Sequence, residues 1–490
     1  MQYGFLIDQR QCIGCHACTV ACKAENEVPV GSFRTWVQYA EKGTFPEVSR
    51  HFAVLRCNHC TSAPCVTICP VNALEKRPDG IVDLDRDECI GCRACMQACP
   101  YDALYLNEDR GTVEKCHFCA HRVERNLEPA CVTVCPVEAI IYGDVHDPNT
   151  RISRMIDDLD TEVRRPEQNT GPNVHYVGHE PSMLQPGSTQ RLQTFLSSEN
   201  PQHKGDVPWP AELPVEPDTR TVLDASHHIE WGWPVALYLV TKGMAAGVAM
   251  LSPFAAVLGL AGFAADYLPE LIALVFTVVT TGLLAGDLAR PMLFLRVLTR
   301  PNTRSWLVRG AWVLTAFTLL LAGALAARWA GMEALADGLR WVHAATGILV
   351  AGYTAFLFGQ CEGRDLWQSR WLLPHLIVQA LLCGAACLLP FAGGNTALLA
   401  IFLISAAMHA VLSLVERHRS HETSNARQAA AFLGTLRLGI LRPLRDGLLV
   451  TMLAVALALF SPPAALAAAL SGLLLYEWVY VRAAQMPPLS

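Results

Sequence analysis

Most of the chain's 19 cysteines gather between positions 12 and 135, in four groups of four. The first and third groups share the spacing C-x2-C-x2-C-x3-C, and the second and fourth widen the middle interval to x4 and x11. Proline follows the last cysteine of each group except the first, where Lys23 follows. The groups are Cys12, Cys15, Cys18 and Cys22; Cys57, Cys60, Cys65 and Cys69; Cys89, Cys92, Cys95 and Cys99; and Cys116, Cys119, Cys131 and Cys135.

This spacing is typical of bacterial ferredoxins, in which three nearby thiolates bind one [4Fe–4S] cubane and the fourth cysteine reaches a partner cluster. A zinc ribbon uses C-x2-C pairs but does not need a third close cysteine followed by x3-Cys-Pro. A disulfide framework has no reason to follow this spacing, and Met1–Arg10 is too short and polar for a signal segment. We therefore predict four [4Fe–4S] clusters on 16 cysteines, none reduced to [3Fe–4S].

The cysteine loops need a scaffold, which we expect to be made of small strands. Short apolar runs at 5–8, 80–84 and 139–143 have the composition of such strands. Residues 160–230 are rich in Pro, Gly, Ser, Asn and Gln, which predicts a long extended connection.

Long apolar runs follow from about Trp231. We expect membrane helices near 234–262, 268–289, 309–330, 339–361, 372–391, 396–416, 445–461 and 464–482, most of which reach the ~20 residues that a bilayer core requires. A soluble core cannot surround so many all-apolar helices. The predicted fold is an α+β double-ferredoxin-like iron–sulfur domain (1–160), an extended linker (161–230) and an all-α transmembrane bundle of about eight helices (231–490).

The four cysteine groups, with the sequence GPNVHY at 171–176, resemble the iron–sulfur subunit of the DMSO reductase type of molybdenum enzymes. The resemblance implies that the first group pairs with the fourth and the second with the third. The implied ligand sets are Cys12, Cys15, Cys18 with Cys135; Cys116, Cys119, Cys131 with Cys22; Cys57, Cys60, Cys65 with Cys99; and Cys89, Cys92, Cys95 with Cys69.

Segments 242–247, 282–291, 300–306 and 351–354 resemble the polysulfide reductase membrane-anchor family. The resemblance implies a quinone-reactive helical bundle without haem. His343, His375 and His409 are the histidines well inside the predicted helices, and they show no facing pair for axial ligation.

Six polar residues are candidates for the quinone site, because a polar group inside a membrane needs a reason to be there. Tyr238 and Tyr353 offer hydroxyls to a quinone carbonyl, and Lys242 shares a helix face with Tyr238. The other three are Asp287, at the end of the second helix, and His228 and Glu230, at the entrance to the first, where they would carry protons. Each has a structural alternative, such as pairing of Asp287 with Arg290.

Arginines are unevenly divided between the loops. The loops after the second, fourth and sixth predicted helices, with the C-terminus, carry 14 arginines, and the opposite loops carry two. The positive-inside rule then predicts a multi-pass protein of the inner (cytoplasmic) membrane whose iron–sulfur domain faces the cytoplasm.

Together these patterns predict the electron-transfer and anchor subunit of a molybdopterin oxidoreductase. Electrons would pass through four clusters between a separate molybdopterin-containing catalytic subunit and membrane quinone, either ubiquinone or menaquinone. We expect no substrate site and no catalytic residue in this chain. Cytoplasmic orientation favours an oxidative complex such as a sulfite dehydrogenase or an acyl-CoA oxidoreductase.

Two alternatives remain. One is a proton-translocating module of a larger respiratory complex, which mid-bilayer carboxylates would favour; Asp287, Glu416 and Glu477 all lie near predicted helix ends. The other is a membrane-tethered ferredoxin with an inert anchor. The net charge of −6 argues against nucleic-acid binding.

Overall fold

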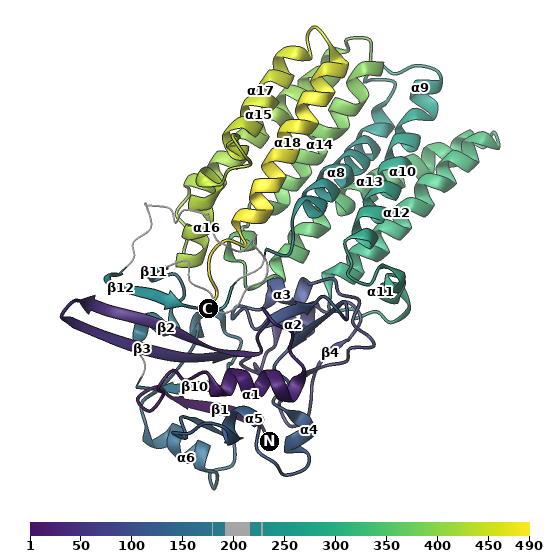
Figure 1. The fold of residues 1–490 in the computed structure, drawn as a ribbon. Coiled ribbons are helices and arrows are strands. Elements are labelled where there is room, and N and C mark those ends of the chain that lie inside the picture. Colours follow the sequence, from purple (N-terminus) through teal and green to yellow (C-terminus); the bar gives the residue numbers. More distant parts are fainter. Residues whose placement is uncertain (179, 192–215, 227–228) are drawn as a thin grey trace. The chain divides into compact units, whose positions relative to one another are not determined.

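The computed structural model describes residues 1–178, 180–191, 216–226 and 229–490, and the chain divides into two compact units (Figure 1). The cluster unit comprises Met1–His228 with two later segments, Cys361–Arg364 and Pro487–Ser490. The membrane unit comprises Ile229–Gln360 and Asp365–Met486. The expected fold class is confirmed, because strands and short helices form the first unit and helices form the second.

The cluster unit contains two four-stranded sheets, in the orders β8-β1-β10-β9 and β11-β12-β2-β3, and two hairpins, β4-β5 and β6-β7. Its strands are β1 Tyr3–Asp8, β2 Thr35–Thr44, β3 Glu47–Arg56, β4 Leu74–Lys76, β5 Val82–Leu84, β6 Leu104–Asn107, β7 Thr112–Lys115, β8 Ile140–Asp144, β9 Thr161–Val163, β10 Val174–Val177, β11 Thr189–Arg191 and β12 Glu216–Leu223. Its helices are α1 Ala17–Asn26, α2 Pro64–Ile68, α3 Ala94–Ala98, α4 Ala120–Val123, α5 Ala130–Thr133, α6 Arg151–Asp158 and α7 Pro181–Leu184.

Strand β1 is central to the first sheet, since it pairs antiparallel with β8 and parallel with β10. Successive side chains of a strand point to opposite faces. Accordingly Phe5 and Ile7 join the main core of the unit, while Leu6 packs on the other face with Ile152 of α6. Both faces of β1 are therefore covered, which explains its continuous apolar sequence.

Parts of the predicted extended linker belong to these sheets. Strands β9 and β10 complete the first sheet, and β12 pairs antiparallel with β2. The long β2–β3 hairpin was not predicted from the sequence. Its inner half is apolar and buried, while its tip, around Phe45, is exposed.

The first and third cysteine groups share a backbone conformation. In each, the glycine of a Cys-Ile-Gly-Cys run has φ +69°, at Gly14 and Gly91, and the residue after the second cysteine is left-handed, at His16 (φ +61°) and Arg93 (φ +60°). Alternation of right- and left-handed residues points successive N–H groups into one concavity, a nest for negative charge. A short helix, α1 or α3, then begins and carries the third cysteine.

The membrane unit consists of helices that run alongside one another (Figure 1). They are α8 Trp233–Leu251, α9 Phe263–Asp266, α10 Leu268–Gly286, α11 Arg296–Thr299, α12 Trp306–Trp329, α13 Glu333–Gly359, α14 Leu372–Leu388, α15 Thr396–His418, α16 Ser424–Thr435, α17 Pro443–Leu457 and α18 Pro462–Ala483.

Seven helices of the described chain are long and apolar enough to cross a membrane, rather than the expected eight. The helix that fails is α17, with 15 residues. At 1.5 Å per residue it is about 22 Å long, shorter than the ~30 Å hydrocarbon core. Arg445 and Asp446 occupy its first turn, which shortens the apolar stretch.

Glycines allow close helix contacts in this unit. A Cβ on Gly247 of α8 would collide with the carbonyl of Ala380 in α14, and one on Gly384 would collide with the backbone of Gly247. Gly447 of α17 and Gly472 of α18 meet in the same way. Small residues at such crossings let helix backbones pack directly, which is a main source of cohesion between membrane helices.

Candidate redox centres

Three pockets in the cluster unit are each lined by four cysteines from two different groups. In every case three come from one group and the fourth from its partner. The sets are Cys12, Cys15, Cys18 and Cys135; Cys22, Cys116, Cys119 and Cys131; and Cys69, Cys89, Cys92 and Cys95.

The remaining four cysteines also lie together. The thiol of Cys65 interacts electrostatically with those of Cys57, Cys60 and Cys99. The four groupings in the structure are thus the ones that the family resemblance implies. Their role as cluster ligands stays a prediction, and the donor sets fit a cubane, which takes one thiolate at each of four irons.

Burial and crowding disfavour ionisation of these thiols in the absence of a positive group. Burial, with neighbouring thiols, raises the pKa of Cys60 to about 12 and that of Cys92 to about 12. Burial raises the pKa of Cys18 to about 11. In the described residues no three His, Cys, Asp or Glu side chains are grouped as ligands of a single metal ion. A cubane does not require that, because its four irons separate the ligands.

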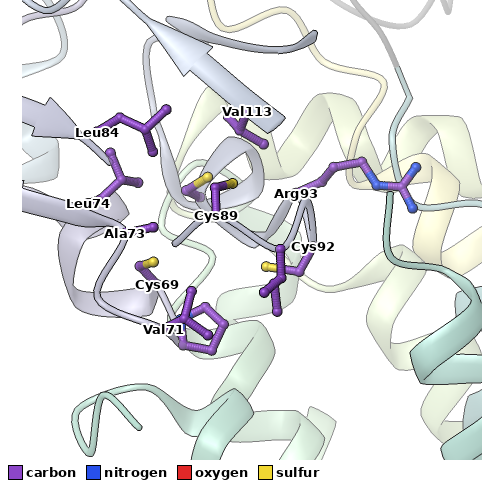
Figure 2. Close-up of a pocket in the computed structure, with 12 residues that line it drawn as sticks. Cys69, Val71, Ala73, Leu74, Leu84, Cys89, Cys92, Arg93 and Val113 are labelled. Atoms are coloured by element: carbon purple, nitrogen blue, oxygen red, sulfur yellow. The ribbon is translucent and has the colours of Figure 1, made fainter. Parts of the chain in front are cut away.

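The pocket of Cys69, Cys89, Cys92 and Cys95 has apolar walls. Figure 2 shows Val71, Leu74, Leu84 and Val113 around the thiols. The one charged residue in its lining, Arg93, directs its guanidinium away from them (Figure 2). Such a wall excludes water and lowers the local dielectric.

The pocket of Cys22, Cys116, Cys119 and Cys131 has polar walls. The Asn26 amide donates to the Cys22 carbonyl over 3.0 Å and lies 3.6 Å from the Cys22 sulfur. Arg34 and Arg56 also line this pocket, and both are buried. By contrast Lys23, the departure from the usual proline, donates to the Pro29 carbonyl over 2.8 Å and therefore has a structural role.

Two of the predicted quinone-site residues come together in the membrane unit. Lys242 of α8 is 2% exposed, and its ammonium donates to Thr354 Oγ1 over 2.5 Å and to the Ala351 carbonyl over 3.1 Å. The same ammonium lies 4.9 Å from the centre of the Tyr353 ring. Tyr238, one turn before Lys242, is also buried. Lys242 therefore does not extend to the surface but points into the bundle.

The other predicted residues lie elsewhere. Asp287 is half-buried at the C-terminal end of α10, whereas Lys242 lies about 13 Å along the neighbouring α8 at 1.5 Å per residue. The backbone N–H of Glu230 donates to the Gln485 side chain over 3.1 Å. His228 lies outside the described residues.

Sequence reasoning missed a buried polar partner of Lys242 and a buried ion pair elsewhere in the bundle. Glu477 of α18 is 2% exposed, interacts electrostatically with Lys242 and bonds to the Gln379 side chain. The signal was present, since Glu477 interrupts an apolar run, but the sequence does not show that Glu477 faces Lys242. A second buried pair, Arg340 and Glu270 at 2.5 Å, joins α13 to α10.

Two of the helix histidines, His375 and His409, contact each other, which the sequence did not predict. His375 Nε2 lies 2.9 Å from His409 Nδ1, and the Tyr476 hydroxyl lies 3.4 Å from His375 Nδ1. Helix periodicity could not show this, because the two histidines come from different helices. The two rings bond directly to each other, and the absence of haem stays a prediction.

Comparison with known families agrees with this two-part organisation. Residues 48–145 match the family described as a 4Fe-4S dicluster domain. Residues 221–392 match the family described as "Polysulphide reductase, NrfD". With the seven apolar helices, the second match indicates a multi-pass membrane protein.

Subunits of several redox enzymes are similar to the front of the chain. The iron–sulfur subunit ArrB of the arsenate respiratory reductase of a Shewanella species is 34% identical over 225 residues, 36% of this chain and 96% of the relative. One component of the polysulfide reductase of Wolinella succinogenes is 39% identical over 173 residues, 35% of this chain and 90% of the relative. One component of the sulfite dehydrogenase of Allochromatium vinosum is 38% identical over 36% of this chain and 82% of the relative.

Proposed function

Since the chain belongs to the family of iron–sulfur subunits of molybdopterin reductases, here joined to an NrfD-type membrane domain, we propose that it links a separate molybdopterin-containing catalytic subunit to membrane quinone. Electrons pass through four [4Fe–4S] clusters held by the four thiol sets. The observation that carries this proposal is the assembly of four complete thiol sets in one unit of a chain whose other unit is a membrane bundle.

We assign the quinone site to the surroundings of Lys242, Tyr238 and Tyr353. A quinone carbonyl needs hydrogen-bond donors, and its reduction needs protons. Lys242 has three N–H donors, two of which bond to Thr354 and Ala351. The Tyr353 ring packs against Gly310 of α12, which fixes its position. Asp287, Glu230 and His228 remain candidates for the proton path.

Replacement of Tyr353 by Phe tests the site. The substitution removes one hydroxyl and keeps the ring against Gly310. One hydrogen bond contributes about 1 kcal/mol, so we expect a several-fold loss of quinone turnover. Cluster reduction by an artificial donor should be unchanged. Steady-state quinone assays on the intact complex measure the first quantity, and rapid optical bleaching measures the second.

Tyr480→Phe provides the matched control, because Tyr480 is another buried tyrosine of the bundle whose hydroxyl lies 3.5 Å from the Leu366 carbonyl. It should leave quinone turnover unchanged. Normal turnover in all of Tyr353→Phe, Tyr238→Phe, Lys242→Met and Asp287→Asn would place the site elsewhere.

We further propose that the cluster unit faces the cytoplasm. The two arginines of the arginine-poor loops are paired with acids: Arg328 with Asp337 at 2.5 Å, and Arg340 with Glu270 at 2.5 Å. An arginine paired with an acid adds little net positive charge to its loop. The difference in positive charge between the two sets of loops is therefore larger, and it favours this orientation more strongly. A cytoplasmic cluster unit favours an oxidative partner, of which sulfite dehydrogenase is one kind.

Labelling of introduced cysteines tests the orientation. Met332 lies exposed between α12 and α13, and Ser420 lies exposed after α15. In intact spheroplasts a membrane-impermeant maleimide should label Met332→Cys and should reach Ser420→Cys only after permeabilisation. The opposite pattern would reverse the orientation.

A further inference from the structure

The pockets of the cluster unit differ in the fixed charge around their thiols. The pocket of Cys12, Cys15, Cys18 and Cys135 has no arginine, lysine or carboxylate in its lining. The pocket of Cys69, Cys89, Cys92 and Cys95 has one charged residue in its lining, Arg93, whose guanidinium points away from the thiols. The pocket of Cys22, Cys116, Cys119 and Cys131 has two buried arginines, Arg34 and Arg56.

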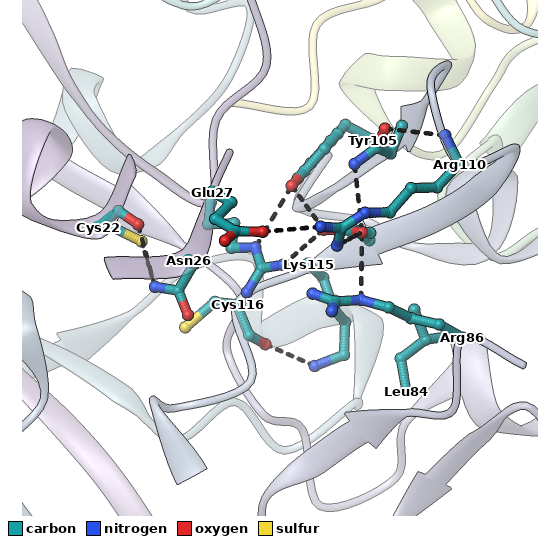
Figure 3. A network of polar contacts seen from close by, with 12 residues as sticks. Cys22, Asn26, Glu27, Leu84, Arg86, Tyr105, Arg110, Lys115 and Cys116 are labelled. Atoms are coloured by element: carbon teal, nitrogen blue, oxygen red, sulfur yellow. Dashed lines mark hydrogen bonds and ion pairs between the residues drawn. The ribbon is translucent and has the colours of Figure 1, made fainter. Parts of the chain in front are cut away.

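The charge of Arg34 is already neutralised. Its guanidinium pairs with Glu114 at 2.5 Å, and both side chains are at most 2% exposed. The same carboxylate of Glu114 also lies 3.0 Å from the Tyr105 hydroxyl, 3.2 Å from Arg86 and 3.3 Å from Arg110. Figure 3 shows these three side chains converging in one polar network. Arg34 therefore has its counter-ion without the thiols.

Arg56 has no such partner. It ends strand β3, is 1% exposed, and pairs with no acidic side chain among the described residues. Its Nη1 lies 3.2 Å from the Cys131 sulfur, and its guanidinium stacks 4.3 Å above the Phe5 ring. Two of its nitrogens, Nε and Nη2, have no hydrogen-bond partner in the part of the chain that the structure describes. It also interacts electrostatically with the Cys116 and Cys18 thiols.

A buried guanidinium without a counter-ion is strongly disfavoured, and arginine cannot escape by losing its proton. The missing negative charge must therefore come from what the thiols hold. A cubane with four thiolates is an anion, and it gains one more negative charge when it accepts an electron.

We propose that Arg56 is the counter-charge of the cluster held by Cys22, Cys116, Cys119 and Cys131, and that it raises the reduction potential of that cluster. One electron arrives from a neighbouring cluster, which is oxidised, and no proton is taken up, because the guanidinium is charged in both states. The reduced cluster is stabilised most, since Coulomb attraction grows with its added charge in this dry site. This inference rests on the proposed ligand assignment.

The test is a potentiometric titration of the whole purified complex, followed by EPR, on the native protein and two variants. Arg56→Met removes the charge at similar volume, and Arg56→Lys retains a charge without the planar fork. We expect Arg56→Met to lower one cluster potential by about 59 mV or more, a tenfold change in the one-electron equilibrium. Arg56→Lys should restore most of it. The other potentials, except a smaller shift in the cluster that includes Cys18, should stay unchanged.

Arg164→Met is the matched control. Arg164 is also fully buried and stacks on Tyr101, 5.7 Å from the ring centre, but its hydrogen bond goes to the Leu489 carbonyl over 2.7 Å. Its removal should shift no potential.

Iron analysis tests the ligand assignment separately from the role of Arg56. Two results would overturn the role of Arg56 and leave the ligand assignment intact. One is a full iron content with unchanged cluster potentials in Arg56→Met. The other is a potential shift in Arg56→Lys as large as that in Arg56→Met. If Arg56→Met loses iron, it is replaced in the test by Arg56→Gln, which keeps a hydrogen-bond donor. The same lowering of one cluster potential is expected, and an unchanged potential with full iron would again overturn the role of Arg56. Incomplete iron in the native protein after reconstitution would instead refute the ligand assignment.

Discussion

The two units assemble their buried polar groups over very different distances along the chain. In the cluster unit, Cys89, Cys92 and Cys95 line one pocket and lie within one heptapeptide. In the membrane unit, Lys242 and its hydrogen-bond partner Thr354 are 112 positions apart. A short spacing is readable in a sequence, because a loop and one helical turn can present three thiols to one centre. A contact between two helices is not.

The two units also differ in the surroundings of their buried charged side chains. In the cluster unit, the carboxylate of Glu114 is held by several arginines, whereas Arg56 faces the thiols and pairs with no acid within the described ranges. In the membrane unit, Lys242 and Glu477 lie among apolar helices with few polar neighbours. We propose that the first arrangement stabilises the fold and tunes a redox centre, and that the second marks the quinone site.

The largest expected effect is the loss of a cluster. Cys95→Ala removes one of the four proposed ligands of its cluster, and the other three thiols would be left crowded and buried. We expect iron to fall from about 16 per chain, four for each cubane, by at least about four. Iron analysis and EPR of the purified protein measure it. Cys387→Ala, in a buried cysteine of α14 outside the four groups, should retain full iron. Equal loss in both variants would contradict the ligand assignment.

A smaller effect is expected from the network beside the clusters. Burial alone raises the pKa of Glu114, but hydrogen bonds and charge from Arg34 outweigh it, and its pKa lies below the usual value. The side chain is therefore ionised at neutral pH. Glu114→Gln leaves Arg34 buried without its partner, which costs about 3 kcal/mol.

Urea denaturation of the cluster unit, followed by visible absorbance, measures that loss. Glu138→Gln is the control, because Glu138 pairs with Arg151 at the surface, where both side chains are at least 60% exposed. Such a pair contributes at most about 1 kcal/mol. Similar sensitivity of the two variants to urea would show that the buried network is not structural.

The smallest effect should be confined to the membrane unit. Gly247→Ala puts a methyl group against the Ala380 carbonyl and forces α8 away from α14. Overpacking of this kind costs about 1–3 kcal/mol. We expect a lower midpoint for thermal unfolding of the helices in detergent and an unchanged iron content. Gly282→Ala, where a Cβ meets nothing within 4 Å, should not lower that midpoint. Iron loss in Gly247→Ala would show that the two units do not fold separately.

Much of the architecture was predictable because it is periodic. The three predicted small strands correspond to β1, β5 and β8, and seven of the predicted spans are present as long helices. The β2–β3 hairpin was missed, because its exposed outer half carries charges and gives no apolar run. The expected span at 445–461 is present as the shorter helix α17, whose first turn holds Arg445 and Asp446.

Residue types and spacing were enough to predict the chemistry of residues 1–160 and the membrane character of residues 231–490. Cysteine type and spacing specify cubane ligation through local geometry, and apolar length specifies membrane helices through the thickness of a bilayer. The partners of isolated buried polar residues depend instead on how separate elements pack. Arg56 meets Cys131, His375 meets His409 and Lys242 meets Thr354 because separate elements pack side by side. No periodicity within one element encodes the angle and register of that packing.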